Sequence, residues 1–274
     1  MQVGKLGVWT SYGRIGEENA AEAARFAEEL GYGTFWLGSS PRLSGLRPLL
    51  EGSEQMVVAT GIANVWAYDP AELAQEYAEL ERDFPGRVLV GIGIGHPEAT
   101  SDYTRPLTAM RAFLDVLDRP ESQIPKERRI LAALAPKMLE LSAQRALGAA
   151  PYFVPVAHTR YAREVLGYGP LLAPELAFAV AGPEPAREYA SLYLSLSNYT
   201  NNLLRHGFTE EDIANGGSDR LIDEVVPNGD VDHIAAIARA HFDAGADHVV
   251  LQAVGEDGIP RAGWTALAEA LLPG

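Results

Sequence analysis

The chain of 274 residues contains no cysteine, which excludes disulfide bonds, thiolate metal sites and cysteine nucleophiles. Basic residues are scarce, with 22 Lys and Arg against 37 Asp and Glu, and the net charge of −15 argues against a nucleic-acid partner. No apolar run approaches the roughly 18 residues that span a bilayer. The stretch from Met1 to Lys5 lacks the charged and apolar regions of a signal peptide. We therefore expect a soluble cytoplasmic protein that binds neither membranes nor nucleic acids.

Several catalytic signatures are also missing. There is no Gly-x-Ser-x-Gly motif and no phosphate-binding Walker loop. Neither His158 with Glu164 nor His233 with His241 has the spacing of metal ligands. We expect no metal site.

What the sequence does contain is a regular alternation of strand and helix patterns. The predicted strands cover residues 3–9, 33–38, 56–63, 87–94, 128–134, 149–154, 175–180 and 247–254. The predicted helices cover residues 17–31, 69–84, 103–118, 136–147, 158–167, 184–206, 230–244 and 263–272. Eight strands in a chain of this length favour an α/β fold of the (β/α)8 TIM-barrel type, as a single domain over residues 1–274. An open, doubly wound sheet is the alternative, but the early Gly-x-Gly-x-x-Gly turn of a dinucleotide-binding unit is absent. The interval from about 184 to 244, between the seventh and eighth strands, is too long for one crossover and predicts an extended helical segment.

One predicted strand is apolar on one face and bare on the other. Val88, Val90, Ile92 and Ile94 alternate with glycines at positions 91, 93 and 95. The apolar face suits packing against helices outside a barrel. The glycine face would leave room inside it for a flat ligand, although a tapering barrel also needs small inward residues.

Several segments, taken in order, resemble the bacterial luciferase-like family, and within it the oxidoreductases that use the deazaflavin coenzyme F420. They are Ala21–Phe35 (AEAARFAEELGYGTF), Thr60–Asn64 (TGIAN), Asp69–Ala74 (DPAELA), Phe84–Val88 (FPGRV) continuing to Gly95-His96-Pro97, Ala135–Met138 (APKM) and Ala244–Val249 (AGADHV). The resemblance implies a barrel with the cofactor ring across its C-terminal mouth. It also implies a bulge with a non-proline cis peptide at the end of the third strand, here within Gly61-Ile62-Ala63-Asn64. The Asp-His pair that sugar-phosphate dehydrogenases of this family carry after the second strand is replaced by Gly38-Ser39-Ser40-Pro41.

Candidate site residues follow from this placement. His96 lies just past a strand, where barrel enzymes place their chemistry, and is the leading proton carrier, with Ser39 and Tyr12 in reserve. Donors for a cofactor phosphate are expected at two predicted helix starts. The cofactor-binding candidates are Gly61, Ile62, Ala63, Asn64, Gly93, Gly95, Lys137, His158, Thr159 and Arg160. The substrate-binding candidates are Trp9, Asn198 and Asn202.

The resulting hypothesis is an oxidoreductase that passes a hydride between coenzyme F420 and a small organic substrate. Two alternatives stay open: an FMN-dependent luciferase-like monooxygenase, and a barrel that binds a flavin or deazaflavin without turnover. The polar run 197–202, in the predicted helix 184–206, is expected to line the pocket or to face the partner of a homodimer, and a hydrated helix face is the alternative. The resemblance to the luciferase-like family favours the homodimer.

Overall fold

Ten parallel strands form the centre of the fold in a computed structural model that describes residues 1–39, 41–96 and 105–272. The strands are β1 (Leu6–Thr10), β2 (Thr34–Gly38), β3 (Val57–Gly61), β4 (Ala63–Asn64), β5 (Val88–Gly93), β6 (Arg129–Leu131), β7 (Gly148–Ala149), β8 (Leu171–Leu172), β9 (Glu175–Phe178) and β10 (Val249–Ala253). Their order is β8-β7-β6-β5-β3-β2-β1-β10-β9, with β4 paired to β5. Ser40, Pro97 and the first two residues of the helix predicted at 103–118 lie outside the described residues.

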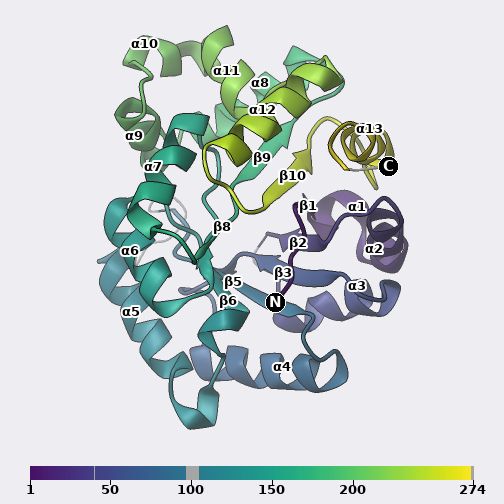
Figure 1. Cartoon of the computed structure of the whole chain (residues 1–274), viewed down its shortest axis with the longest axis vertical. Helices are drawn as coiled ribbons and strands as arrows, with labels where there is room; N and C mark the ends of the chain where they lie inside the picture. Colours follow the sequence, from purple (N-terminus) through teal and green to yellow (C-terminus); the bar gives the residue numbers. More distant parts are fainter. Residues whose placement is uncertain (40, 97–104, 273–274) are drawn as a thin grey trace.

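Two pairs of short strands each represent one interrupted barrel strand. The cis peptide bond Gly61–Ile62 separates β3 from β4, at the bulge that the family resemblance implied. Ala173 and Pro174 separate β8 from β9, and β8 pairs with β7 while β9 pairs with β10. A bridge between Tyr152 and Glu175 adds a further link at this seam. The eight predicted strands are therefore all present, and the sheet curls into the predicted TIM barrel (Figure 1).

Helices surround the sheet. They are α1 (Tyr12–Ile15), α2 (Ala20–Glu29), α3 (Arg47–Gly52), α4 (Pro70–Asp83), α5 (Pro106–Leu117), α6 (Pro136–Arg145), α7 (Val156–Leu166), α8 (Pro183–Leu194), α9 (Ser197–Arg205), α10 (Glu210–Ile213), α11 (Asp219–Val225), α12 (Val231–Asp243) and α13 (Arg261–Leu271). The start of α4 follows the predicted signal, because the Asp69 side chain accepts hydrogen bonds from the backbone N–H groups of Ala71 and Glu72. Among the described residues, no helix is long and apolar enough to cross a membrane.

The predicted helix 184–206 is interrupted. It divides into α8 and α9, with Leu196 in an extended conformation between them. Figure 1 shows α8 to α11 gathered at one end of the molecule. This extra group of helices is the extended segment predicted between the seventh and eighth strands. It packs on an aromatic cluster that includes Phe153 and Tyr199.

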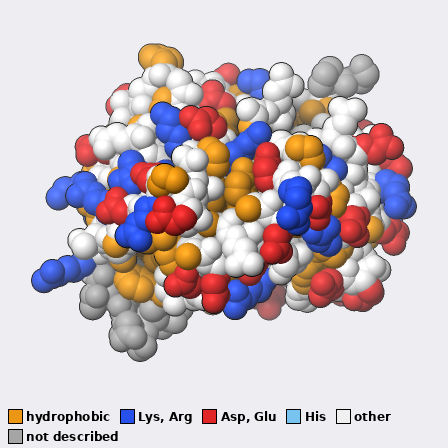
Figure 2. Space-filling model, turned by 90° about the horizontal axis from the view of Figure 1, so that it is seen from below, with side chains coloured by type: hydrophobic (Ala, Val, Ile, Leu, Met, Phe, Trp, Pro, Cys, Tyr) orange, Lys and Arg blue, Asp and Glu red, His pale blue; other side chains and the backbone are white. Residues whose placement is uncertain are grey.

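Alternation along the strands separates two cores. Val88, Val90 and Ile92 pack between the barrel and its helices, as their shared face predicted. Leu89 on the same strand packs inside the barrel, with neighbours that include Trp36. On the outer surface, acidic and basic side chains are interspersed (Figure 2). Arg47 with Asp83, at 2.6 Å, is one of the ion pairs that such a surface forms.

Candidate functional site

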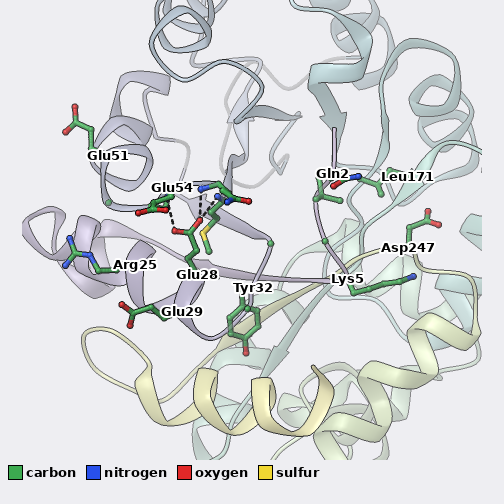
Figure 3. Close-up of a pocket in the computed structure, with 18 residues that line it drawn as sticks. Gln2, Lys5, Arg25, Glu28, Glu29, Tyr32, Glu51, Glu54, Leu171 and Asp247 are labelled. Carbon is green, nitrogen blue, oxygen red and sulfur yellow. Dashed lines mark hydrogen bonds between the residues drawn. The ribbon is translucent and has the colours of Figure 1, made fainter. Parts of the chain in front are cut away.

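A hollow of about 1200 Å³ lies at the N-terminal ends of the strands, where residues such as Lys5, Tyr32 and Leu171 line it (Figure 3). Its Glu28 carboxylate accepts hydrogen bonds from three backbone N–H groups, of residues 54 to 56, at 2.7 to 2.8 Å. These bonds tie the loop before β3 to α2. Barrel enzymes place their chemistry at the opposite, C-terminal end, so this hollow is not the candidate site.

At the C-terminal mouth, the Trp9 indole occupies the space beside two glycines. A Cβ atom at Gly38 would lie 1.9 Å from the indole ring, and one at Gly61 would lie 2.8 Å from the indole nitrogen. That nitrogen donates a hydrogen bond to the Gly61 carbonyl oxygen at 3.3 Å. These glycines therefore make room for a side chain of the protein itself. The partly exposed indole spans β2 and β3 and forms an apolar wall of the mouth, as its candidacy for the substrate pocket requires.

The glycine face of β5 is partly covered as well. A Cβ atom at Gly93 would lie 2.8 Å from Cδ1 of Ile62 and 3.2 Å from Cβ of Ala132. Gly95 adopts a positive φ of 59°, and a Cβ there would lie 2.9 Å from Nδ2 of Asn64. The expectation of empty space over this face is therefore wrong at Gly93. A ligand at this position meets the Ile62 side chain before it meets the strand.

Because Ile62 covers Gly93, a larger side chain at position 93 is expected to act on the mouth through Ile62. Gly93→Val is expected to leave the barrel folded, because the nearest atoms are the flexible end of Ile62, and to abolish cofactor binding by pushing that side chain into the mouth. Fluorescence titration with cofactor, alongside circular dichroism of the free protein, measures both effects.

The matched control is the double variant Gly93→Val/Ile62→Ala, in which the displaced side chain is missing. Recovery of binding in the double variant supports the proposed route. Normal binding by Gly93→Val alone would show that this strand face does not line the site.

His96 is placed at the mouth by contacts with α9. Its Nδ1 lies 3.2 Å from Oδ1 of Asn198, and its ring centroid lies 5.2 Å from that of Tyr199. Because an amide oxygen can only accept, Nδ1 is the donor, and Nε2 is the basic nitrogen of the neutral ring. The structure thus brings His96 together with the substrate candidate Asn198, although the two are 102 residues apart in sequence.

Asn202, also on α9, is 1% exposed, and neither its Nδ2 nor its Oδ1 has a hydrogen-bond partner within the described residues. A buried amide with both ends unused is costly, so a ligand or a water molecule is the expected partner. Asn202 therefore remains a binding candidate.

Tyr12 and Ser39, the two reserve proton carriers, have surroundings that differ from those of His96. The Tyr12 hydroxyl donates to the Gly45 carbonyl oxygen at 2.5 Å, and burial raises its pKa. Ser39 is exposed and has a positive φ of 67°. Neither arrangement connects these side chains to the contacts of His96.

The predicted phosphate donors divide into two groups. Lys137 in the first turn of α6 and Arg160 in α7 are exposed, as a phosphate site requires. His158 and Thr159 are 0% exposed and bond within the protein: His158 to the Leu134 carbonyl oxygen at 3.0 Å, Thr159 to His241 at 2.8 Å. His158 and Thr159 do not fit a phosphate-binding role, because the face of α7 that carries them packs inward.

A polar cluster at the floor of the mouth was not predicted from the sequence. Gln252 on β10 accepts hydrogen bonds at its Oε1 from the hydroxyls of Tyr152, at 3.2 Å, and Tyr189, at 2.7 Å. The hydroxyl oxygens of Tyr189 and Tyr193 lie 3.1 Å apart. Glu175 begins β9 beside this cluster, and burial raises its pKa well above the usual range. Strand alternation alone would have placed Glu175 and Gln252 on inward positions, and a charged residue there is a signal of function.

Comparisons with known proteins agree with this fold. A family model described as luciferase-like monooxygenase matches residues 3–214. An F420-dependent secondary alcohol dehydrogenase superimposes with a TM-score of 0.73 at 15% identity, covering 99% of this chain and 98% of that one. The coenzyme F420-dependent tetrahydromethanopterin reductase from Methanopyrus kandleri gives 0.73 at 14% identity, covering 98% of each chain. The oxygenating constituent of 3,6-diketocamphane monooxygenase from Pseudomonas putida, in complex with FMN, gives 0.68 at 14% identity, covering 98% and 97%.

No curated protein matches this chain by sequence. The family match covers most of the chain, so the protein belongs to the luciferase-like monooxygenase family, whose fold it shares. Its structural neighbours include oxidoreductases that depend on F420 and a monooxygenase in complex with FMN.

Proposed function

We propose that this protein is a coenzyme F420-dependent oxidoreductase that transfers a hydride between the deazaflavin and a small organic substrate. The proposal rests on the combination of apolar and polar side chains at the mouth of the barrel. Trp9 and Ile62 present apolar surface there, with His96 among the site's polar groups, and a planar ring with one reactive face fits such a wall.

The residues present fit a ring cofactor with a phosphate-bearing tail. Ile62 and Trp9 would contact the ring. The amide of Asn202 and the Nε2 atom of Gln252, which have no partner among the described residues, offer hydrogen bonds to its polar edge. Lys137 and Arg160 are the exposed basic side chains that would hold a phosphate near two helix starts. When bound, F420 supplies a two-electron hydride carrier.

The protein's own part is to orient the substrate, exclude water and hold a proton at a defined atom. The bond to Asn198 fixes the His96 tautomer, so that Nε2 can take a proton from a substrate hydroxyl or return one to a carbonyl oxygen. Asn198 is then a positioning residue, and His96 is the proposed acid–base group.

Cofactor preference is the first test. We expect the protein to bind F420 with a dissociation constant in the micromolar range or tighter, and FMN at least tenfold more weakly, a difference of about 1.4 kcal/mol. Parallel fluorescence titrations with the two cofactors measure the preference. Equal affinity, or tighter FMN, would place the protein in the flavin-dependent branch.

The FMN-dependent monooxygenase remains the second candidate, because such an enzyme is among the structural neighbours. Oxygen separates the two candidates, since a deazaflavin has carbon in place of the nitrogen beside the oxygen-reactive position of a flavin. Turnover that persists when oxygen is removed supports the hydride-transfer proposal, and a strict oxygen requirement contradicts it.

A further inference from the structure

The floor of the barrel mouth carries two side chains whose hydrogen-bonding capacity the protein leaves unused. Glu175 pairs in register with Val250 across the β9–β10 interface, and Gln252 follows two residues later on β10. Leu176 and Leu251 pack in the outer core, between the barrel and the helices. By alternation, Glu175 and Gln252 therefore both point into the barrel, as diagonal neighbours on adjacent strands.

The Gln252 amide is fixed by its oxygen. Oε1 accepts from two tyrosine hydroxyls, those of Tyr152 and Tyr189, so Nε2 is left for another partner. The side chain is 1% exposed, and within the described ranges Nε2 has no hydrogen-bond acceptor. A buried N–H donor of this kind points to an acceptor supplied by a ligand.

Glu175 supplies a second donor. Its carboxyl group forms no hydrogen bond or ion pair with any residue in 1–39, 41–96 or 105–272. The residue is partly exposed, and strand alternation points its side chain into the barrel. Burial raises its pKa well above the usual range, which favours the protonated form, and that form presents an O–H donor. Ionised, it would be an anion without a cationic partner in a largely enclosed site.

We propose that Glu175 and Gln252 form a donor pair that binds a neutral carbonyl oxygen at the floor of the mouth. The inference rests on the proposed function, in that it takes the mouth as the ligand site, and it names the chemistry recognised there. Two donors that converge on one oxygen bind a carbonyl, which accepts two hydrogen bonds without donating one. The carbonyl can belong to the substrate or to the pyrimidine edge of the cofactor ring.

Binding of a carbonyl oxygen by Glu175 and Gln252 is expected to weaken as the pH rises. When Glu175 loses its proton it becomes an acceptor and an anion, and it then repels a carbonyl oxygen. The other groups facing the pair are the hydroxyls of Tyr152 in the segment after β7, of Tyr189 and Tyr193 on α8, and of Tyr199 on α9. Arg14 is stacked over Tyr189, and His96 lies against Tyr199. Burial raises the pKa of each of the four tyrosines, so their hydroxyls stay neutral while Glu175 titrates.

The experiment uses cyclohexanone as the carbonyl probe and methylenecyclohexane as a control of the same shape without oxygen. Both are titrated against the intact protein without cofactor, by NMR, and the infrared carbonyl stretch of bound cyclohexanone is recorded. Glu175→Met and Gln252→Met are each expected to weaken cyclohexanone binding roughly tenfold, about 1.4 kcal/mol, and to leave methylenecyclohexane within twofold. The bound carbonyl stretch should move toward its value in hydrocarbon solvent.

Glu175→Gln is the matched variant, because it keeps an N–H donor and cannot ionise. Wild-type affinity for cyclohexanone should fall as the pH rises through the Glu175 pKa, whereas Glu175→Gln should bind with little dependence on pH. The same titration in His96→Gln removes the other titratable ring of the site. If a Met variant does not fold by circular dichroism, the pH response of Glu175→Gln still decides the question.

Parallel titrations with F420 and FMN identify the source of the oxygen. Weaker cyclohexanone binding in the Met variants assigns the pair to the substrate, and weaker cofactor binding alone assigns it to the ring. The proposal is overturned if both Met variants bind cyclohexanone, F420 and FMN with unchanged affinity. It is also overturned if the cyclohexanone affinity of Glu175→Gln depends on pH as that of the wild type does. Failure of the proposed function has a different signature, namely tighter FMN or an oxygen requirement, because the cyclohexanone measurements involve no cofactor.

Discussion

Acidification from pH 7 to about pH 4.5 is expected to unfold this protein, because three buried histidines are neutral in the folded state. His158, His241 and His248 are each no more than 1% exposed. Burial lowers the pKa of each to about 4. The ordinary value, near 6.5, applies once the chain is unfolded and the rings are in water.

The sign follows from the proton count. Between about pH 6.5 and pH 4 the unfolded chain binds more protons than the folded one, so the stability present above pH 6.5 is lost as the pH falls through that window. Each histidine contributes a loss of about 2 kcal/mol between pH 7 and 4.5. Three such losses are comparable with the whole stability of an ordinary domain, 5–15 kcal/mol. Glu28 acts in the same direction below its ordinary pKa, since the three backbone N–H bonds lower its pKa against the effect of burial.

Urea unfolding at a series of pH values measures this dependence. His241→Gln removes one titrating group and should reduce the slope of unfolding free energy against pH by up to 1.4 kcal/mol per pH unit. His233→Gln, at an exposed position on the same helix α12, is the matched control substitution. A free energy of unfolding that is flat between pH 7 and 4.5 would contradict the neutral, buried state of these rings.

The second large effect is expected on turnover. His96→Ala should slow the reaction by roughly 10²- to 10⁴-fold, the usual range for removal of a general acid or base. Affinity for the cofactor should stay within a few-fold, because Trp9 and Ile62 still form the apolar wall. Steady-state kinetics with the best substrate from a screen of alcohols and carbonyl compounds, together with cofactor titration, measure the two quantities separately.

Asn198→Ala tests how His96 is held. It should lower turnover less than His96→Ala, since the imidazole remains but its tautomer is no longer fixed through Nδ1. His233→Ala on α12 is the control without an expected effect. Full activity in His96→Ala would assign the proton transfer to another group and leave the proposed cofactor unaffected.

The barrel was predictable because it rests on local patterns. Alternation on β5 identified the inward and outward faces, and Asp69 with Pro70 marked the start of α4. The breaks between β3 and β4 and between β8 and β9 depend instead on where those residues lie in the barrel. Pro174 divides the seventh strand where its backbone carbonyl still accepts from the Val250 N–H at 3.0 Å, and no repeat in the sequence marks that point. Helix α3, only six residues long, has too few apolar positions to show a helical period.

The site was less predictable, because its contacts join distant segments. The glycine face of β5 was identified correctly, but a sequence pattern cannot show that Ile62, between β3 and β4, covers Gly93. Trp9 reaches Gly61 across 52 residues. His158 and Thr159 were assigned from their place near a helix start, and the rotation of α7 that buries them depends on packing with Leu134 and His241.

The pairing of β1 with β10 has a consequence for how the chain is made. Leu6 pairs with Val249, so the first strand receives its second neighbour only after nearly the whole chain has been synthesised. Until then, β1 presents an unpaired edge, and β9 on the other side of the gap lacks its partner as well. Open edges of parallel strands are templates for association between unfinished chains. The growing polypeptide therefore carries these two open strand edges until β10 emerges from the ribosome, and a chaperone that shields the first strand would act in that interval.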